Sequence, residues 1–364
     1  MKAICNMLVL LLTIGLTLTS QILIGQTSEK NVEIRGVYGN PKPFWEKGLK
    51  LGDLGVNAVF VHRGAINAEM VKHAREEGLQ FYSEFPTLNG KGYVQEHPEA
   101  WAINEKGEKV EAADWFMGVC PTEPGFREFR FNQLRELLTD YNIDGVWMDY
   151  VHWHAQFEDP HPILPETCFC DNCLNNFSKH SDLEIPNGTT AEKAKWILSE
   201  QEQNWRDWRC TVIYNWAVEM KKIIKKHNPE ALLGLYYCPW TDEEYNGARR
   251  KILGLDLEML TEVIDVFSPM VYHGRMERKP EWVAENIKWQ SEKLNIQENS
   301  FPKIWTIVQA HNSPGVISAE EFKTVLLGGL AGKATGVMMF TTYAVAEDNE
   351  KTEVMKSIYK NFQK

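Results

Sequence analysis

Short apolar runs alternate along the chain with longer segments whose apolar residues recur at helical spacing. Apolar runs of this length, bounded by turn residues, are typical of strands buried on both faces of a parallel sheet. Eight such runs follow one another from residue 32 on: Val32–Tyr38, Val56–His62, Leu79–Phe85, Gly145–Tyr150, Leu232–Cys238, Val263–Tyr272, Lys303–Ala310 and Gly336–Tyr343. Helical spacing is found between them in Asn67–Glu77, Gly125–Asp140, Trp205–His227, Trp282–Leu294 and Ser318–Ala331. The alternation predicts an α/β fold, and eight strands are the number that closes a (β/α)8 TIM barrel.

Two connections are too long to be simple returns between strand and helix. They are Pro86–Glu123, after the third run, and His152–Glu200, after the fourth. Long loops in compact folds are commonly functional. Because both leave the carboxyl ends of strands, we expect two long loops over the carboxyl-terminal face of a single barrel domain, residues 27–364.

The N-terminus has the pattern of an export signal. Lys2 precedes an apolar run from Met7 to Leu18, and small and polar residues follow it. We expect a signal peptide over residues 1–26 and an exported protein, periplasmic or secreted. An uncleaved anchor is the alternative. No comparable apolar stretch follows, so we expect no membrane span after signal removal.

Composition narrows the class of partner. The net charge of -11 argues against nucleic acid and anionic membranes. The 13 Trp and 12 Tyr exceed what packing alone usually requires, and flat aromatic faces are surfaces against which sugar rings lie. We therefore expect a carbohydrate partner and no organic cofactor, while the oligomeric state is left open.

The fourth run ends on a carboxylate. In the stretch YNIDGVWMDYVHW, residues 141–153, the apolar residues Val146, Trp147 and Met148 directly precede Asp149. A charged side chain at the far end of a buried strand has no packing reason to be there, and in an α/β barrel this end carries the chemistry. We therefore expect Asp149 to be catalytic; a hydrogen-bonded structural acid is the alternative.

Four cysteines fall in the two long connections. Cys168, Cys170 and Cys173 lie within six residues, and Cys120 lies in the other connection. Four thiolates can close a tetrahedral structural zinc site, which would leave no position for substrate and would join the two loops. Disulfides, for example between Cys170 and Cys173, are the alternative in an oxidising compartment. A redox or iron–sulfur role is weaker.

Several stretches resemble a known group of enzymes. Residues 97–109 (HPEAWAINEKGEK), 120–150, the CFCDNC cluster and residues 263–273 (VIDVFSPMVYH) resemble exported, glycosyl-hydrolase-like (β/α)8 barrels of bacteria. The CPTEP segment with CFCDNC is similar to the zinc-binding cysteine set of family 42 β-galactosidases. The resemblance implies a barrel that acts on glycosidic bonds, with Asp149 as the carboxylate after the fourth strand. Family 42 enzymes carry an Asn–Glu pair there, where this chain has Asp149 and Tyr150.

Glycoside hydrolysis requires two carboxyl groups, one that protonates the leaving oxygen and one that attacks or activates water. The partner of Asp149 must come from the carboxyl end of another strand. The turn after the fifth run offers Asp242, Glu243 and Glu244, and the end of the third run offers Glu84. Acids in such a turn also favour the start of a helix whatever the function.

Polar and aromatic residues at strand ends are candidates for substrate binding. His62, His152, His273 and Gln309 could hydrogen-bond sugar hydroxyls, and Tyr38, Trp153, Trp240, Tyr272 and Tyr343 could line or stack in the pocket. Hydrolysis of glycosidic bonds in an oligo- or polysaccharide is the leading hypothesis. A glycan-binding barrel without catalysis is the second, and another carbohydrate-active enzyme, such as a lyase or deacetylase, is the third.

Overall fold

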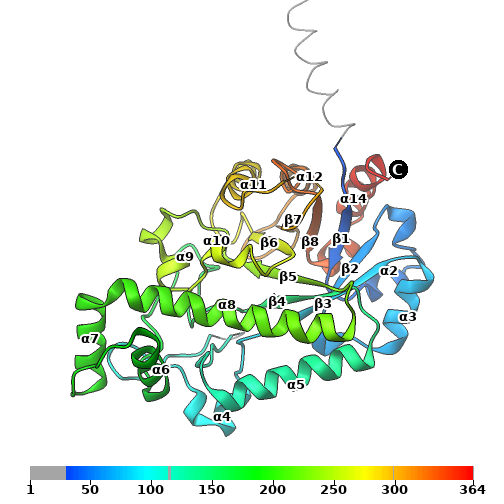
Figure 1. The fold of residues 1–364 in the computed structure, drawn as a ribbon. Helices are drawn as coiled ribbons and strands as arrows, with labels where there is room; N and C mark the ends of the chain where they lie inside the picture. Colours follow the sequence, from blue (N-terminus) through cyan, green and yellow to red (C-terminus); the bar gives the residue numbers. More distant parts are fainter. Residues whose placement is uncertain (1–29, 114–115, 298, 364) are drawn as a thin grey trace, which may run out of the picture.

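The computed structural model describes residues 30–113, 116–297 and 299–363. Within them, parallel strands pair in chain order and close on themselves as a barrel (Figure 1). The strands are β1 (Ile34–Tyr38), β2 (Ala58–His62), β3 (Gln80–Pro86), β4 (Gly145–Asp149), β5 (Leu232–Tyr237), β6 (Val266–Val271), β7 (Lys303–Gln309) and β8 (Gly336–Phe340). Each predicted run supplies one of them, and the predicted (β/α)8 barrel is confirmed.

Helices surround the barrel. They are α2 (Lys42–Glu46), α3 (Ala68–Glu76), α4 (Tyr93–Glu96), α5 (Pro124–Asp140), α6 (Asp171–Ser181), α7 (Thr190–Glu200), α8 (Glu202–His227), α9 (Ala248–Lys251), α10 (Leu257–Leu260), α11 (Trp282–Lys293), α12 (Ala319–Gly328), α13 (Thr342–Ala346) and α14 (Asn349–Asn361). The long helices α5 and α8 run side by side along one flank, and α6 and α7 pack beside the first half of α8 (Figure 1).

Two strands, β6 and β8, are shorter than their apolar runs by three residues or more. The run from Val263 starts too early because Val263 and Ile264 donate their backbone N–H groups to Leu260 at the end of α10. The last run ends too late because the Thr341 hydroxyl accepts from the Ala344 N–H at 3.2 Å and caps α13. Local hydrogen bonds therefore end elements inside apolar stretches.

An aromatic layer fills the middle of the barrel. Trp147 of β4 stacks on Trp305 with 5.5 Å between ring centroids, and Phe60 and Tyr82 contact it at 5.0 and 4.7 Å. Its indole donates to the Ser268 hydroxyl at 3.0 Å. The ring fits only because the residue beside it on β5 is Gly234, where a Cβ atom would lie 2.1 Å from the indole.

The second long connection is not a simple loop, since it contains α6 and α7. It also pairs with the first long connection, through a bridge between Asn104 and Thr167 and a 2.9 Å hydrogen bond from Phe169 N–H to the Ile103 carbonyl. The two connections thus form one layer around the start of α8.

The predicted signal peptide, residues 1–26, lies outside the described residues. In the part of the chain that the structure describes, no helix combines the length and apolarity needed to cross a bilayer.

Candidate active site

Two carboxyl groups meet at the carboxyl ends of neighbouring strands. Glu84 points into the barrel from β3, Asp149 ends β4, and their side chains hydrogen-bond to each other. Glu84 is 1% exposed and accepts a 2.7 Å hydrogen bond from the Tyr38 hydroxyl of β1. Its other oxygen lies 3.9 Å from Nε2 of His62. Alternation along the strands explains the pair, because Glu84 and Asp149 each lie two residues after an inward aromatic.

The pair holds a proton. Burial and the charge of Glu84 raise the pKa of Asp149 well above its usual value, although the Tyr150 N–H donates to Asp149 Oδ1 at 2.8 Å. Burial also raises the pKa of Glu84, while His62 and hydrogen bonds from Tyr38 and Asp149 oppose that rise. Two neighbouring carboxyls cannot both ionise cheaply. Asp149 is therefore the member of the pair that keeps a proton more readily.

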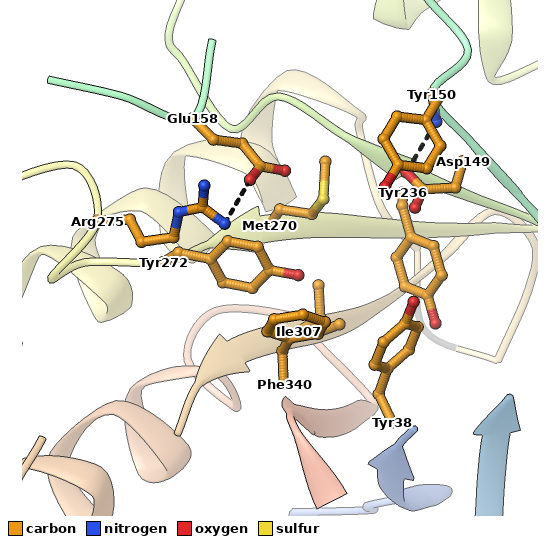
Figure 2. A pocket seen from close by; sticks show the side chains of 10 residues that line it. All are labelled: Tyr38, Asp149, Tyr150, Glu158, Tyr236, Met270, Tyr272, Arg275, Ile307 and Phe340. Atoms are coloured by element: carbon orange, nitrogen blue, oxygen red, sulfur yellow. Dashed lines mark hydrogen bonds and ion pairs between the residues drawn. The ribbon is translucent and has the colours of Figure 1, made fainter. Parts of the chain in front are cut away.

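Asp149 opens into a cavity of about 300 Å³ at the mouth of the barrel (Figure 2). Such a volume lies at the lower end of the range for small-molecule sites. Its lining combines aromatic rings, two acids and one cation: Tyr38, Asp149, Tyr150, Glu158, Tyr236, Met270, Tyr272, Arg275, Ile307 and Phe340.

Glu158 enters this cavity from the second long connection. It lies in a short loop closed by two 2.9 Å backbone hydrogen bonds between Gln156 and Ile163. Its neighbour Phe157 is buried and packs edge-on against Trp240. The loop is thus anchored on both sides of the carboxylate, which Figure 2 shows across the cavity from Asp149.

Arg275 balances the charge of Glu158. It follows β6, and its guanidinium lies 2.8 Å from the Glu158 carboxylate. Burial raises the pKa of Glu158, and the cation opposes that rise. The backbone N–H of Arg275 donates to Gln309 Oε1 at 3.1 Å, and the Gln309 amide donates to the His311 and Ser313 carbonyls. Gln309 therefore joins the β6 and β7 loops behind the site.

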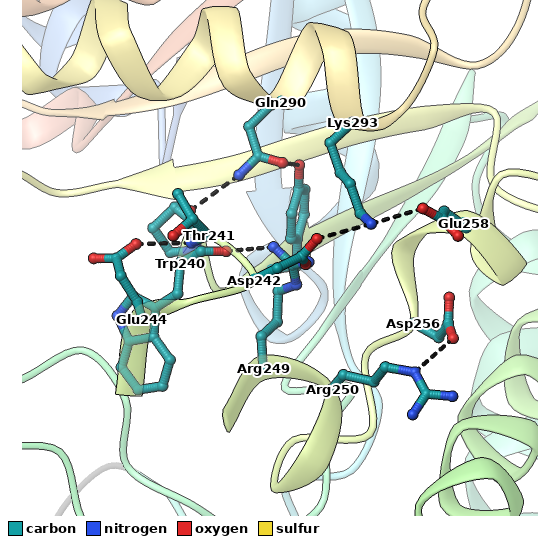
Figure 3. A network of polar contacts seen from close by, with 12 residues as sticks. Trp240, Thr241, Asp242, Glu244, Arg249, Arg250, Asp256, Glu258, Gln290 and Lys293 are labelled. Atoms are coloured by element: carbon teal, nitrogen blue, oxygen red, sulfur yellow. Dashed lines mark hydrogen bonds and ion pairs between the residues drawn. The ribbon is translucent and has the colours of Figure 1, made fainter. Parts of the chain in front are cut away.

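The acids predicted after β5 have other partners (Figure 3). Asp242 is paired with Arg249 and, at 2.8 Å, with Lys293 of α11. Glu244 is paired with Arg278 at 2.7 Å and accepts from the Thr241 N–H. Neither lines the cavity with Asp149. Glu243 does not line it either, so of the four candidate partners the structure brings Glu84 alone to Asp149.

The predicted binding residues separate into four groups. Tyr38 and Tyr272 line the cavity, and His62 lies beside Glu84 at its edge. Three lie behind the wall: His152, buried against Phe116 and Phe157, His273, paired with Glu321, and Gln309. Trp153 and Trp240 are buried, so they offer no ring face to a ligand. Tyr343 lines a different cavity.

Five charged or aromatic lining residues were not among the predicted site residues: Tyr150, Glu158, Tyr236, Arg275 and Phe340. Tyr236 carries a usable signal, because it alternates inward on β5. Glu158 and Arg275 stand in loops without a periodic pattern, and only their opposite charges hint that they meet.

The four cysteines of the long connections form a buried cluster. The Sγ atoms of Cys120, Cys168, Cys170 and Cys173 all lie within 4.8 Å of one another, and the described cysteines are free thiols. Cys120 Sγ is 3.5 Å from Cys170 Sγ and 3.4 Å from Cys173 Sγ. Thiolates around a tetrahedral ion with bonds of about 2.3 Å lie about 3.8 Å apart. The cluster could therefore hold a metal ion.

Two backbone amides support that donor set. The Ile103 N–H points to Cys168 Sγ and the Cys173 N–H to Cys170 Sγ, each at 3.4 Å. Amide donors around sulfur stabilise the thiolate form that a metal requires. The cluster lies between the two long connections, away from the cavity lining.

Comparisons with known proteins bear on the fold. No protein-family model and no curated protein sequence matches the chain. Among solved structures, it is similar to a β-galactosidase from the psychrophilic Marinomonas ef1, with a TM-score of 0.65 and 13% identity over 89% of this chain and 58% of that one. The glycoside hydrolase domain of PgaB (BpsB) from Bordetella bronchiseptica gives 0.64 and 11%, over 89% of this chain and 98% of that one.

A family 42 β-galactosidase is among these neighbours. Gan42B from G. stearothermophilus gives a TM-score of 0.61 and 12% identity over 92% of this chain. The chain spans 58% of the length of Gan42B and 58% of the length of the Marinomonas enzyme. At these identities the likeness establishes the fold. The chain thus has the (β/α)8 barrel of several glycoside hydrolases, with an acid pair at the end of β3 and β4.

Proposed function

We propose that this protein is a glycoside hydrolase in which Asp149 and Glu158 are the two carboxyl groups that act on the substrate. One observation carries the proposal: both side chains face one cavity at the carboxyl-terminal mouth of the barrel, from opposite sides (Figure 2). Glycosidases place their two carboxyls on either side of the scissile bond. Glu84 is too close to Asp149 for this role, because a direct hydrogen bond is shorter than the about 5 Å of a retaining pair.

Asp149 is the general acid in this scheme. Burial and the charge of Glu84 raise its pKa, which favours the protonated state needed to protonate the leaving oxygen. Glu84 receives the Asp149 hydrogen bond in the resting site and is itself fixed by Tyr38. Glu84 is thus a positioning residue, which keeps the proton on Asp149.

Glu158 is the carboxylate that attacks the sugar or activates water. Burial raises the pKa of Glu158, and Arg275, 2.8 Å away, opposes that rise and so favours the ionised carboxylate. The tyrosines of the lining supply hydroxyls and ring faces to the sugar between the two acids. Two structural neighbours, a β-galactosidase and a glycoside hydrolase domain, agree with this substrate class.

We propose further that the cysteine cluster holds a structural zinc ion. Four thiolates would close its coordination, so the ion would join the two long connections and take no part in the chemistry. Export, read from the N-terminal pattern, completes the proposal of a periplasmic or secreted enzyme. The N-terminus of the mature protein, measured by mass spectrometry, tests the export signal.

Substitution of each acid tests the mechanism. We expect Asp149→Asn and Glu158→Gln each to lower kcat on oligosaccharides by about 10²- to 10⁴-fold. Nitrophenyl glycosides leave without protonation, so Asp149→Asn should lose far less activity on them, whereas Glu158→Gln should lose activity on both. Glu244→Gln is the matched control, because its carboxylate pairs with Arg278 outside the cavity.

A glycan panel that includes both substrate types decides the outcome. Unchanged activity of Asp149→Asn or Glu158→Gln would remove that residue from the reaction. The alternative function, glycan binding without cleavage, draws on one observation: each acid already has a protein partner. Binding of a glycan by the wild type with no product release would establish that alternative.

A further inference from the structure

A second cavity lies on the same rim of the barrel. It measures about 600 Å³ and is built where β7 and β8 end, from the loop after β7 and the start of α14. Its lining residues are His311, Asn312, Thr341, Tyr343, Ala344, Glu347, Asp348, Asn349 and Glu350. The proposed reaction uses none of them.

Tyr343 gives this cavity an exposed ring face. It is 65% exposed, more than any other aromatic residue in the described part of the chain. Its backbone is fixed within α13, which the Thr341 side chain caps. An exposed, rigidly mounted aromatic ring loses little conformational entropy when a flat ligand stacks on it.

Asn312 gives it a polar donor of fixed orientation. Its Oδ1 accepts from the Ile317 N–H at 3.0 Å and from Nζ of the buried Lys351 at 2.9 Å. Lys351 is held in turn by the Ala310 carbonyl at 2.9 Å. Because the oxygen already accepts from these donors, the amide N–H₂ of Asn312 can act as donor to hydroxyl oxygens of a ligand.

Two of the three acids of the lining have structural roles, and the third, Glu350, is exposed. Asp348 Oδ1 caps α14 by accepting from the Glu350 and Lys351 N–H groups, and Glu347 pairs with Lys47 at 2.9 Å. The cavity is therefore not dominated by unpaired negative charge. A ring face with amide donors fits a neutral sugar better than a cation.

The two cavities share a wall. The ring of His311, which lines the second cavity, packs at 5.0 Å on Phe340 and at 6.1 Å on Tyr272, both of which line the first. The chain also passes directly from Phe340 to Thr341. The two cavities are therefore adjacent along the rim.

We propose that the Tyr343 cavity is a second sugar-binding subsite and that the substrate is therefore an oligo- or polysaccharide whose chain extends from the catalytic cavity across the β8 end of the rim. The inference rests on the proposed hydrolytic function, which places the cleaved bond in the first cavity. It assigns Tyr343 to stacking and Asn312 to hydrogen bonding with a sugar that is not itself cleaved.

Chain-length dependence tests the subsite. Binding of galacto-, gluco-, xylo- and N-acetylglucosamine oligosaccharides of two to six sugars is measured by calorimetry in the Asp149→Asn background, which prevents turnover. We expect one series to bind more tightly as it lengthens. Tyr343→Ala should weaken binding of the longest member by about 2- to 12-fold, the scale of one aromatic contact, and leave the disaccharide unchanged.

Two variants serve as controls. Tyr343→Phe keeps the ring and should bind like the parent protein. Phe301→Ala removes an exposed aromatic beside the opposite, amino-terminal end of β7 and should have no effect. Equal binding of the longest oligosaccharide with and without the Tyr343 ring, or affinity that does not rise with length, overturns the subsite.

The proposed hydrolysis fails by a different result. If wild-type protein releases no product but length-dependent binding is lost in Tyr343→Ala, the subsite stands and the catalytic assignment falls. If no series binds but the wild type releases product from a nitrophenyl glycoside, the subsite falls and the catalytic assignment stands.

Discussion

Replacement of Gly234 by alanine tests whether the aromatic layer beneath the acid pair is as tightly packed as the structure shows. The new Cβ atom would lie 2.1 Å from Cε2 and 2.2 Å from Cδ2 of Trp147, far inside any real contact. Neither partner can yield easily. Gly234 is held in register between β4 and β6, and the Trp147 ring is confined by Trp305 and by its bond to Ser268.

We expect Gly234→Ala to lower the free energy of unfolding by about 3 kcal/mol, the upper part of the range for overpacked cores. Trp147→Ala alone should cost about 3 to 5 kcal/mol. In that background the alanine methyl has space, so its further cost should fall to near zero. The difference between the two backgrounds is a coupling energy of about 3 kcal/mol, as for residues in contact.

Urea unfolding followed by far-UV circular dichroism measures these values, because its signal does not depend on the substituted tryptophan. Gly92→Ala is the matched control, since nothing lies within 4 Å of a Cβ at that position. A cost below about 0.5 kcal/mol for Gly234→Ala, or an equal cost in both backgrounds, would refute the packing argument.

Two further predictions concern the proton and the metal. Because the charge of Glu84 raises the pKa of Asp149, Glu84→Gln should lower that pKa, so that the acid form is lost sooner as pH rises. The basic limb of the kcat/KM profile should then move to lower pH, and an unmoved limb would contradict the shared proton. Cys173→Ser should abolish bound zinc, measured by elemental analysis, and lower the thermal midpoint, whereas Cys210→Ser, outside the cluster, should retain the ion; metal-free, fully stable wild-type protein would end the zinc proposal.

The barrel could be predicted from sequence because its strands are buried on both faces and therefore read as continuous apolar runs. The position of Asp149 followed from the same pattern, since a carboxylate at a strand end is visible against an apolar run. The helices α6 and α7 were not predicted, because each has only 11 residues and lies inside a connection that was interpreted as a long loop.

The opposing acid could not be found in the same way. Glu158 reaches the cavity through a short hairpin anchored by Phe157 on Trp240, a contact between residues 83 positions apart. Asp242 and Glu244 look better placed along the chain, but Lys293 of α11 and Arg278 bind them on the outside. Which acid faces the cavity depends on where distant cations lie, and no local pattern records that.

The aromatic layer under Asp149 and Glu84 also affects how protons reach these two acids. Phe60, Tyr82 and Trp147 are buried and in mutual contact, so packed rings separate the two acids from the amino-terminal side of the barrel. Any proton spent in the reaction must be replaced through the same opening that admits the sugar. If Glu158 activates water, a bound glycan would close this opening and Asp149 would regain its proton only after product leaves; if Glu158 attacks the sugar, the water of the second step returns the proton to Asp149.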